Sequence, residues 1–215
     1  MLKLGANGGQ LRSILCLGAH CDDIEIGCGG SVLRLVAENP GLKVTWAVLS
    51  SDELRAKEAQ ASAALFLQGA GDAAIRIAGF RDSFFPYEGA AIKEHLLEIR
   101  QEVEPDLIFT HHRGDRHQDH RVVSELTWNL FRNHLVLEYE IPKYDGDMGA
   151  PNFFLPLDDA HCRRKLEITM GAFASQRGKP WFSEETFRAL MRIRGVEANA
   201  PSGYAEGFYA HKCVF

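Results

Sequence analysis

The sequence predicts an α/β fold in which strands and helices alternate along the chain. Short apolar runs at residues 13–18, 43–49 and 106–110 are typical of strands that are buried on both faces. Each run is followed by a stretch with helical spacing, as in units whose parallel strands are joined by right-handed crossovers. We therefore expect a Rossmann-like, mostly parallel sheet with helices on both faces and the active site at the carboxyl ends of the strands.

The individual elements follow from local signals. A cluster of glycines leads into a helix at 31–38, which Asn39-Pro40-Gly41 ends. Ser51 or Asp52 can cap the next helix at 53–67, which is rich in Ala, Glu, Lys and Leu. The remaining expected elements are strands at 74–77, 106–110 and 136–141, helices at 90–103, 122–133, 159–176 and 183–193, loops at 79–89 and 144–149, and a mixed segment at 203–215 that can return as a final strand.

Length and composition narrow the class of protein. The 215 residues predict one domain at 11–215, preceded by a flexible leader at 1–10. The net charge of −5 gives no electrostatic footprint for nucleic acid, and no apolar run is long enough for a membrane span or a secretion signal. Five cysteines without a disulfide framework favour a reducing cytoplasm. A homo-oligomer is left open, because no sequence feature marks an interface.

Two polar clusters follow strands at the predicted functional edge of the sheet. His20, Asp22 and Asp23 come directly after the first strand, and residues 111–120 hold four histidines and two aspartates. Adjacent buried carboxylates repel each other, and a divalent cation removes that repulsion. Imidazole with carboxylate suits Zn²⁺, or Fe²⁺, Mn²⁺ or Co²⁺ with lower selectivity. Three ligands from the two clusters would leave a carboxylate and a histidine unligated, as the base and the proton donor that amide hydrolysis needs.

The two clusters also carry a family resemblance. AHCDDIEIGCGG at 19–30 resembles the AHPDD-type signature of the PIG-L/LmbE-like zinc-dependent N-deacetylases, which include GlcNAc-PI de-N-acetylases. HHRGDRHQDHR at 111–121 resembles the second signature of that family, His-x-Asp-His preceded by an Asp. A weaker similarity continues through Arg55, Asp82 and the segment YAEGF at 204–208. The resemblance implies hydrolysis of the N-acetyl group of an amino sugar or sugar conjugate, a small-molecule substrate, to acetate and a free amine.

Carried over by position, the resemblance implies a role for each residue of the two signatures. His20, Asp23 and His120 would bind the zinc ion. Asp22 would be the general base that activates the metal-bound water. His117 would steady the oxyanion or protonate the leaving amine.

The resemblance also gives a role to Asp119 and weaker roles to Arg55 and Asp82, and Cys21 and Asp115 are among the positions that depart from the family pattern. Asp119 would orient a neighbouring histidine, and Arg55 and Asp82 would contact substrate hydroxyl or phosphate groups. Cys21 replaces the usual Pro; ligation by its thiol would close the open metal position, so we do not expect it to be a ligand. Asp115 stands where some members have a Tyr that helps to stabilise the oxyanion.

Two other interpretations of the same residues stay open. A metal-dependent phosphoesterase would use two ions, for which Asp22, Asp115 and Asp119 offer ligands. A catalytically degenerate metal-binding or scaffold protein would explain Cys21. The presence of both the base and the oxyanion histidine argues against degeneration.

Several residues outside these assignments have two interpretations each. His111 and His112 either support the first cluster or are structural. Arg81 and Arg113 either bind a phosphate or are solvated surface charges. The aromatic residues of 80–87 either stack on a sugar or pack the loop. The histidines expected to be hydrogen-bonded structural residues are His95, His134, His161 and His211.

Overall fold

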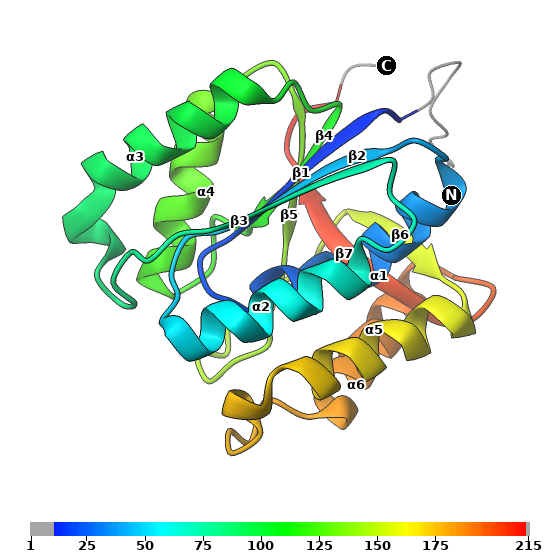
Figure 1. Cartoon of the computed structure of the whole chain (residues 1–215). Coiled ribbons are helices and arrows are strands. Elements are labelled where there is room, and N and C mark those ends of the chain that lie inside the picture. The colour runs from blue at the N-terminus through cyan, green and yellow to red at the C-terminus, as the bar shows by residue number, and fades with distance from the viewer. Residues whose placement is uncertain (1–10, 214–215) are drawn as a thin grey trace.

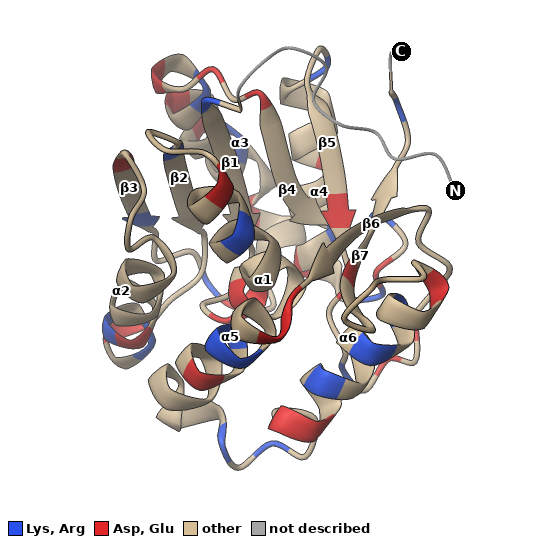
Figure 2. Cartoon of the chain, turned by 90° about the vertical axis from the view of Figure 1, so that its right-hand side faces the viewer, with Lys and Arg blue, Asp and Glu red and all other residues tan. Residues whose placement is uncertain are grey.

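The computed structural model of the chain describes residues 11–213, and the predicted leader at 1–10 lies outside this range. The strands are β1 (Ser13–Gly18), β2 (Lys43–Val48), β3 (Asp72–Ile77), β4 (Leu107–His111), β5 (Leu135–Tyr139), β6 (Phe153–Leu157) and β7 (Tyr204–Ala210). They form one sheet in the order β3-β2-β1-β4-β5-β7-β6, as Figure 2 shows. Neighbours from β3 to β5 are parallel, and β7 is antiparallel to both β5 and β6. The predicted α/β fold with a mostly parallel sheet is confirmed.

Helices cover both faces of this sheet (Figure 1). They are α1 (Asp23–Glu38), α2 (Glu53–Phe66), α3 (Phe85–Glu102), α4 (Gln118–Leu130), α5 (Asp159–Ala172), the short 3₁₀ helix η1 (Ala174–Gln176) and α6 (Glu184–Glu197). Successive side chains of a strand point to opposite faces. Ile14 and Cys16 of β1 therefore join the core beneath α1, α2, α5 and α6, whereas Leu15 and Leu17 join the core beneath α3 and α4.

Helix α1 begins at Asp23, well before the predicted start at residue 31. Its glycines lower helix propensity, but they allow the helix to lie close to the sheet. A Cβ atom on Gly27 would lie 2.2 Å from the Tyr139 ring, and one on Gly30 would lie 2.5 Å from Leu157. The glycines are thus part of the helix rather than its leader, and they bring the residues before it against the carboxyl edge of the sheet.

Helices α3 and α4 also begin earlier than predicted, and each start has a capping contact. Helix α3 begins at Phe85, inside the expected loop at 79–89, and the Phe85 amide donates to Asp119 Oδ1 at 3.2 Å. Helix α4 begins at Gln118, where His117 is the N-cap. The cap of α3 comes from another helix, so local sequence patterns do not reveal it.

Strand β6 was not predicted. Its sequence FFLPL contains Pro156, which argues against a strand in the interior of a sheet. β6 lies at the edge and pairs only with β7, so the missing amide proton is tolerated. The predicted final strand is β7, which ends at Ala210.

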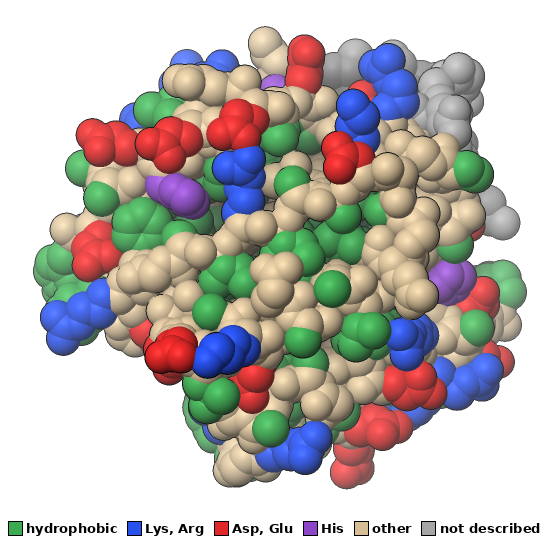
Figure 3. All heavy atoms as spheres, in the orientation of Figure 1, with side chains coloured by type: hydrophobic (Ala, Val, Ile, Leu, Met, Phe, Trp, Pro, Cys, Tyr) green, Lys and Arg blue, Asp and Glu red, His purple; other side chains and the backbone are tan. Residues whose placement is uncertain are grey.

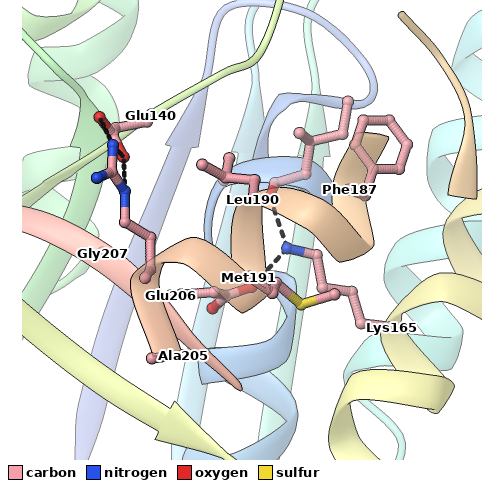
Figure 4. A pocket seen from close by; sticks show the side chains of 11 residues that line it. Glu140, Lys165, Phe187, Leu190, Met191, Ala205, Glu206 and Gly207 are labelled. Atoms are coloured by element: carbon pink, nitrogen blue, oxygen red, sulfur yellow. Dashed lines mark hydrogen bonds and ion pairs between the residues drawn. The ribbon is translucent and has the colours of Figure 1, made fainter. Parts of the chain in front are cut away.

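A buried ion pair joins α1, α5 and β7 (Figure 4). Lys165 Nζ lies 2.6 Å from Glu206 Oε1, and both side chains are almost completely buried. The Glu206 carboxylate also accepts hydrogen bonds from the amides of Gly30 and Ser31, and Lys165 donates to the carbonyl of Ile26. Every contact of the pair on α1 is to main-chain groups, so the pair fixes the backbone of α1 relative to the sheet.

Replacing Lys165 by Met should lower the free energy of unfolding by about 3–5 kcal/mol, because Glu206 would be left as an uncompensated buried charge. Chemical denaturation would measure the change. Lys57→Met is the matched control: Lys57 pairs with Glu53 at the surface, so its removal should cost less than about 1 kcal/mol. Equal losses in the two variants would contradict the role assigned to Lys165.

The described surface carries charges of both signs. On the face shown in Figure 3, acidic and basic side chains are intermingled. Within residues 11–213, no helix combines the length and the apolar composition that crossing a bilayer requires.

Candidate active site

The two polar clusters of the sequence lie side by side in the structure. β1 and β4 are neighbouring parallel strands, in which Cys16 pairs with Phe109. The loops that follow them therefore leave the same edge of the sheet. His20 from the first loop and His120 from the start of α4 approach within 3.2 Å, measured between Nδ1 and Nε2.

The side chains of His20, Asp23 and His120 form a triangle, in which each histidine faces a different carboxylate oxygen of Asp23. His20 Nδ1 lies 3.4 Å from Asp23 Oδ2, and His120 Nε2 lies 3.5 Å from Asp23 Oδ1. Two ligands bound about 2.0–2.1 Å from a tetrahedral ion lie about 3.3 Å apart. All three side chains are buried. Their spacing and donor atoms therefore fit a divalent cation.

The charges around His20 also favour a cation at this place. Asp23, Asp82 and Asp119 all have a carboxylate oxygen within 3.4 Å of the His20 ring nitrogens. Burial lowers the pKa of His20, but these carboxylates, Asp23 foremost, raise it well above its ordinary value. The surroundings of His20 thus stabilise positive charge.

His120 is held by an acidic side chain that the sequence did not single out for this purpose. Asp115 Oδ2 lies 2.9 Å from His120 Nδ1 and 2.9 Å from Lys143 Nζ. Burial and the neighbouring His111 lower the pKa of His120 to about 4, so its ring is neutral at neutral pH. Asp115 thus turns Nε2 toward His20 and Asp23, with Lys143 compensating its charge.

Asp22 has one buried carboxylate oxygen that no other side chain or amide engages among the described residues. Its Oδ1 accepts a hydrogen bond from Arg55 Nη2 at 2.8 Å, whereas Oδ2 has no partner among residues 11–213. Burial raises the pKa of Asp22, although Arg55 counteracts this. Arg55, expected to contact substrate, thus lies against the predicted base, and both line one cavity of about 260 Å³ with His20, Asp23 and other residues.

Asp119, expected to orient a neighbouring histidine, lies against His20. Asp119 Oδ2 is 3.3 Å from His20 Nε2 and also accepts the amide of Ser83 at 2.6 Å. Ser83 has a positive φ of 66°, which is unusual for a residue other than glycine. This contact fixes the loop that brings Asp82 Oδ1 within 3.2 Å of His20 Nε2.

His117 has its two ring nitrogens in different surroundings. As the N-cap of α4, its Nδ1 accepts the amide of Asp119 at 3.3 Å. Because that amide can only donate, Nδ1 is unprotonated and Nε2 carries the proton. Burial and His20 lower the pKa of His117, which favours the neutral ring. His117 lines the same cavity and offers a hydrogen-bond donor there.

The structure also decides between the two interpretations of His111. His111 Nε2 accepts the amide of Ala19 at 2.9 Å and lies 3.2 Å from Asp23 Oδ2, so it supports the first loop. Cys21 points away: its thiol donates to the Ser50 carbonyl at 3.3 Å, and burial raises its pKa to about 12. The Cys21 thiol is thus directed at the Ser50 carbonyl rather than at the ligands of the first cluster.

Two segments outside the two polar clusters also line the cavity, and the second belongs to residues 171–182, for which the sequence left open either a substrate loop or a plain helix exit. Tyr144 comes from the loop after β5, and Lys179 and Trp181 come from the segment after η1. The aromatic residues of 80–87 do not line the cavity. Arg113 binds Glu138 rather than facing the cavity.

Comparison with known proteins agrees with the two signatures. Residues 15–131, more than half of the chain, match the family model described as PIG-L, GlcNAc-PI de-N-acetylase. The uncharacterized deacetylase YaiS of Escherichia coli (strain K12) is 28% identical over 146 residues, which cover 64% of this chain and 78% of that protein.

Solved structures share the fold at lower identity. The N,N′-diacetylchitobiose deacetylase of Pyrococcus horikoshii has a TM-score of 0.68 and 21% identity, covering 93% of this chain and 84% of that one. GalB, the 4-carboxy-2-hydroxymuconate hydratase of Pseudomonas putida KT2440, has a TM-score of 0.78 and 18% identity, covering 95% and 98%. With both signatures present and the family model spanning them, the chain belongs to the PIG-L (GlcNAc-PI de-N-acetylase) family of LmbE-like deacetylases.

Proposed function

We propose that the protein is a metal-dependent deacetylase that hydrolyses the N-acetyl group of an amino sugar or sugar conjugate. The observation that carries this proposal is the cavity in which the His20–Asp23–His120 triangle lies beside the free Oδ2 of Asp22. The family match and the YaiS relative support deacetylation. The chitobiose deacetylase among the structural neighbours supports an N-acetylated sugar as the substrate class.

His20, Asp23 and His120 would hold the metal ion. Two imidazoles and a carboxylate suit Zn²⁺, and Fe²⁺, Mn²⁺ and Co²⁺ are the alternatives. When bound, such an ion supplies Lewis acidity, which lowers the pKa of water and polarises an amide carbonyl. Within the PIG-L family match, this ligand set accounts for both signatures of the sequence.

The remaining side chains would move the protons. Asp22 would accept a proton from the attacking water at Oδ2 while Arg55 holds Oδ1. His117 would donate its Nε2 hydrogen bond to the oxygen that becomes negative as the carbonyl is attacked. Asp22 would then return the proton to the leaving amine. Asp22 as the base and the neutral His117 as the hydrogen-bond donor would thus meet the two requirements of amide hydrolysis, proton transfer and stabilisation of the oxyanion.

The substrate would enter past Tyr144 and Trp181, whose rings offer apolar faces to a sugar. Arg55 lines the cavity, so its guanidinium is one candidate for a contact with a substrate hydroxyl. Asp82, the most exposed carboxylate at His20, is the second candidate for such a contact. These residues favour a small-molecule glycoconjugate.

The two-metal phosphoesterase has less support. Asp115 is already engaged by His120 and Lys143, and Asp119 accepts the amides of Ser83 and Phe85. Both carboxylates already accept hydrogen bonds that a bridging ion would have to displace.

A substrate panel tests the proposed function. The metal-loaded protein would be incubated with acetamido sugars, their conjugates and phosphoesters, and acetate, free amine and phosphate would be measured. We expect acetate and amine in equal amounts from at least one acetamido sugar. Release of phosphate without acetate would replace the deacetylase with a phosphoesterase.

Replacing Asp115 by Asn should weaken metal binding by about 10–100-fold, because His120 would lose the carboxylate that orients it. A competition titration with a chelating dye would measure the affinity. Asp147→Asn is the matched control, since Asp147 contacts Lys143 but not His120. Equal effects of the two substitutions would show that the Lys143 pairing, rather than the orientation of His120, is what matters.

A further inference from the structure

A second group of potential metal ligands lies outside the catalytic cluster. His112 follows β4, Glu138 belongs to β5 and His211 follows β7, and one atom from each lies within 4.8 Å of the other two. Glu138 Oε2 is 2.9 Å from His112 Nδ1 and 3.0 Å from His211 Nε2. Three separate parts of the chain thus direct two imidazoles at one carboxylate oxygen.

The His112 ring is held in place on two sides. It stacks on Tyr209 with ring centroids 3.7 Å apart and planes inclined by 14°. Gly114 lies on it so closely that a Cβ atom there would be 2.6 Å from His112 Nε2. These contacts restrict the plane of the ring, and Nδ1 lies toward Glu138.

The surroundings of Glu138 determine which oxygen is presented. Its side chain is fully buried. Oε1 accepts hydrogen bonds from Arg113 Nε at 3.1 Å and from Trp128 Nε1 at 2.5 Å. Burial raises the pKa of Glu138, but His112 and the other donors lower it to about 2, so the group is an anion. Arg113 Nε and Trp128 thus fix Oε1, while Oε2 faces the two histidines and also accepts the amide of Arg113 at 3.0 Å.

We propose that His112 Nδ1, Glu138 Oε2 and His211 Nε2 form a second site for a divalent first-row cation, with Zn²⁺ as the best match. Two histidines and one carboxylate are a common ligand set for such ions. The partial exposure of His112 and His211 gives the ion an entrance from solvent. A bound ion would tie the segment after β7 to β4 and β5.

Metal content after zinc loading and desalting tests the second site. The wild type is compared with His211→Ala, which removes a partly exposed ligand beyond the last strand. His161→Ala is the matched control, because His161 also pairs with a carboxylate, Asp158, but has no second histidine beside it. We expect His211→Ala to bind one ion fewer than the wild type, and His161→Ala to bind as many.

A second comparison separates this site from the catalytic one. In the His120→Ala background, zinc should still raise the melting temperature, and adding His211→Ala should abolish that shift. Metal contents that are equal in the wild type and His211→Ala would overturn the proposal and leave the group as a hydrogen-bonded clamp only. Neither outcome bears on deacetylation, which depends on other residues.

Discussion

Replacing Asp22 by Asn is expected to lower kcat for acetate release by about 10²–10⁴-fold and to leave the metal content unchanged. Asn has the shape of Asp and can still accept the hydrogen bond of Arg55, but it cannot take a proton at neutral pH. Steady-state kinetics and elemental analysis of the same preparation would measure both quantities.

The pH profile provides the control for this variant. Protonation of Asp22 inactivates the base, so the wild-type rate should fall as the pH is lowered. Because burial raises the pKa of Asp22, this fall should begin at a higher pH than it would for an aspartate with an ordinary pKa. The Asn variant should lack this acidic limb. A variant that kept the wild-type rate, or the same limb, would remove Asp22 from its assigned role.

His120→Ala is expected to lose the catalytic ion and with it all measurable deacetylation. His120 is almost completely buried and is one of the three proposed ligands, so its removal should leave too few for tight binding. Metal content and acetate release would be measured together.

His95→Ala serves as the control for a general effect of removing a histidine, since His95 belongs to α3 and does not line the cavity. It should keep both metal and activity. A His120→Ala protein that retained the catalytic ion and its activity would contradict the ligand assignment.

Much of the fold was predictable because the buried strands are continuous apolar runs. Ile14 to Leu17 fill both cores, and only a strand buried on both faces needs that pattern. The early start of α1 was not predictable from propensity, because the glycines that weaken the helix are the ones that let it approach Tyr139. Strand β6 was not predictable either, because Pro156 argues against a strand. The proline is tolerated only because β6 lies at the edge of the sheet.

The candidate site was predictable where its residues are neighbours in sequence. His20, Asp22 and Asp23 directly follow a strand, so their nearness in space is already visible in the sequence. Lys143 was missed because it lies in a loop without periodicity and reaches Asp115 only through the fold.

Glu138 was also missed, although a carboxylate inside the apolar strand LVLEY is itself a signal. A buried acid is rarely unpaired, so Glu138 predicts that basic or hydrogen-bond-donating partners lie beside it. What the sequence could not supply was their identity, because His112 and His211 reach it from two other strands.

Metal add-back during acetate release tests the central claim most directly. The purified protein would be stripped with a chelator, dialysed, and assayed on an acetamido sugar before and after addition of Zn²⁺, Fe²⁺, Mn²⁺ or Co²⁺. We predict no acetate from the stripped protein and recovery of acetate release with at least one of these ions. Undiminished acetate release by protein shown to be free of metal would contradict the account.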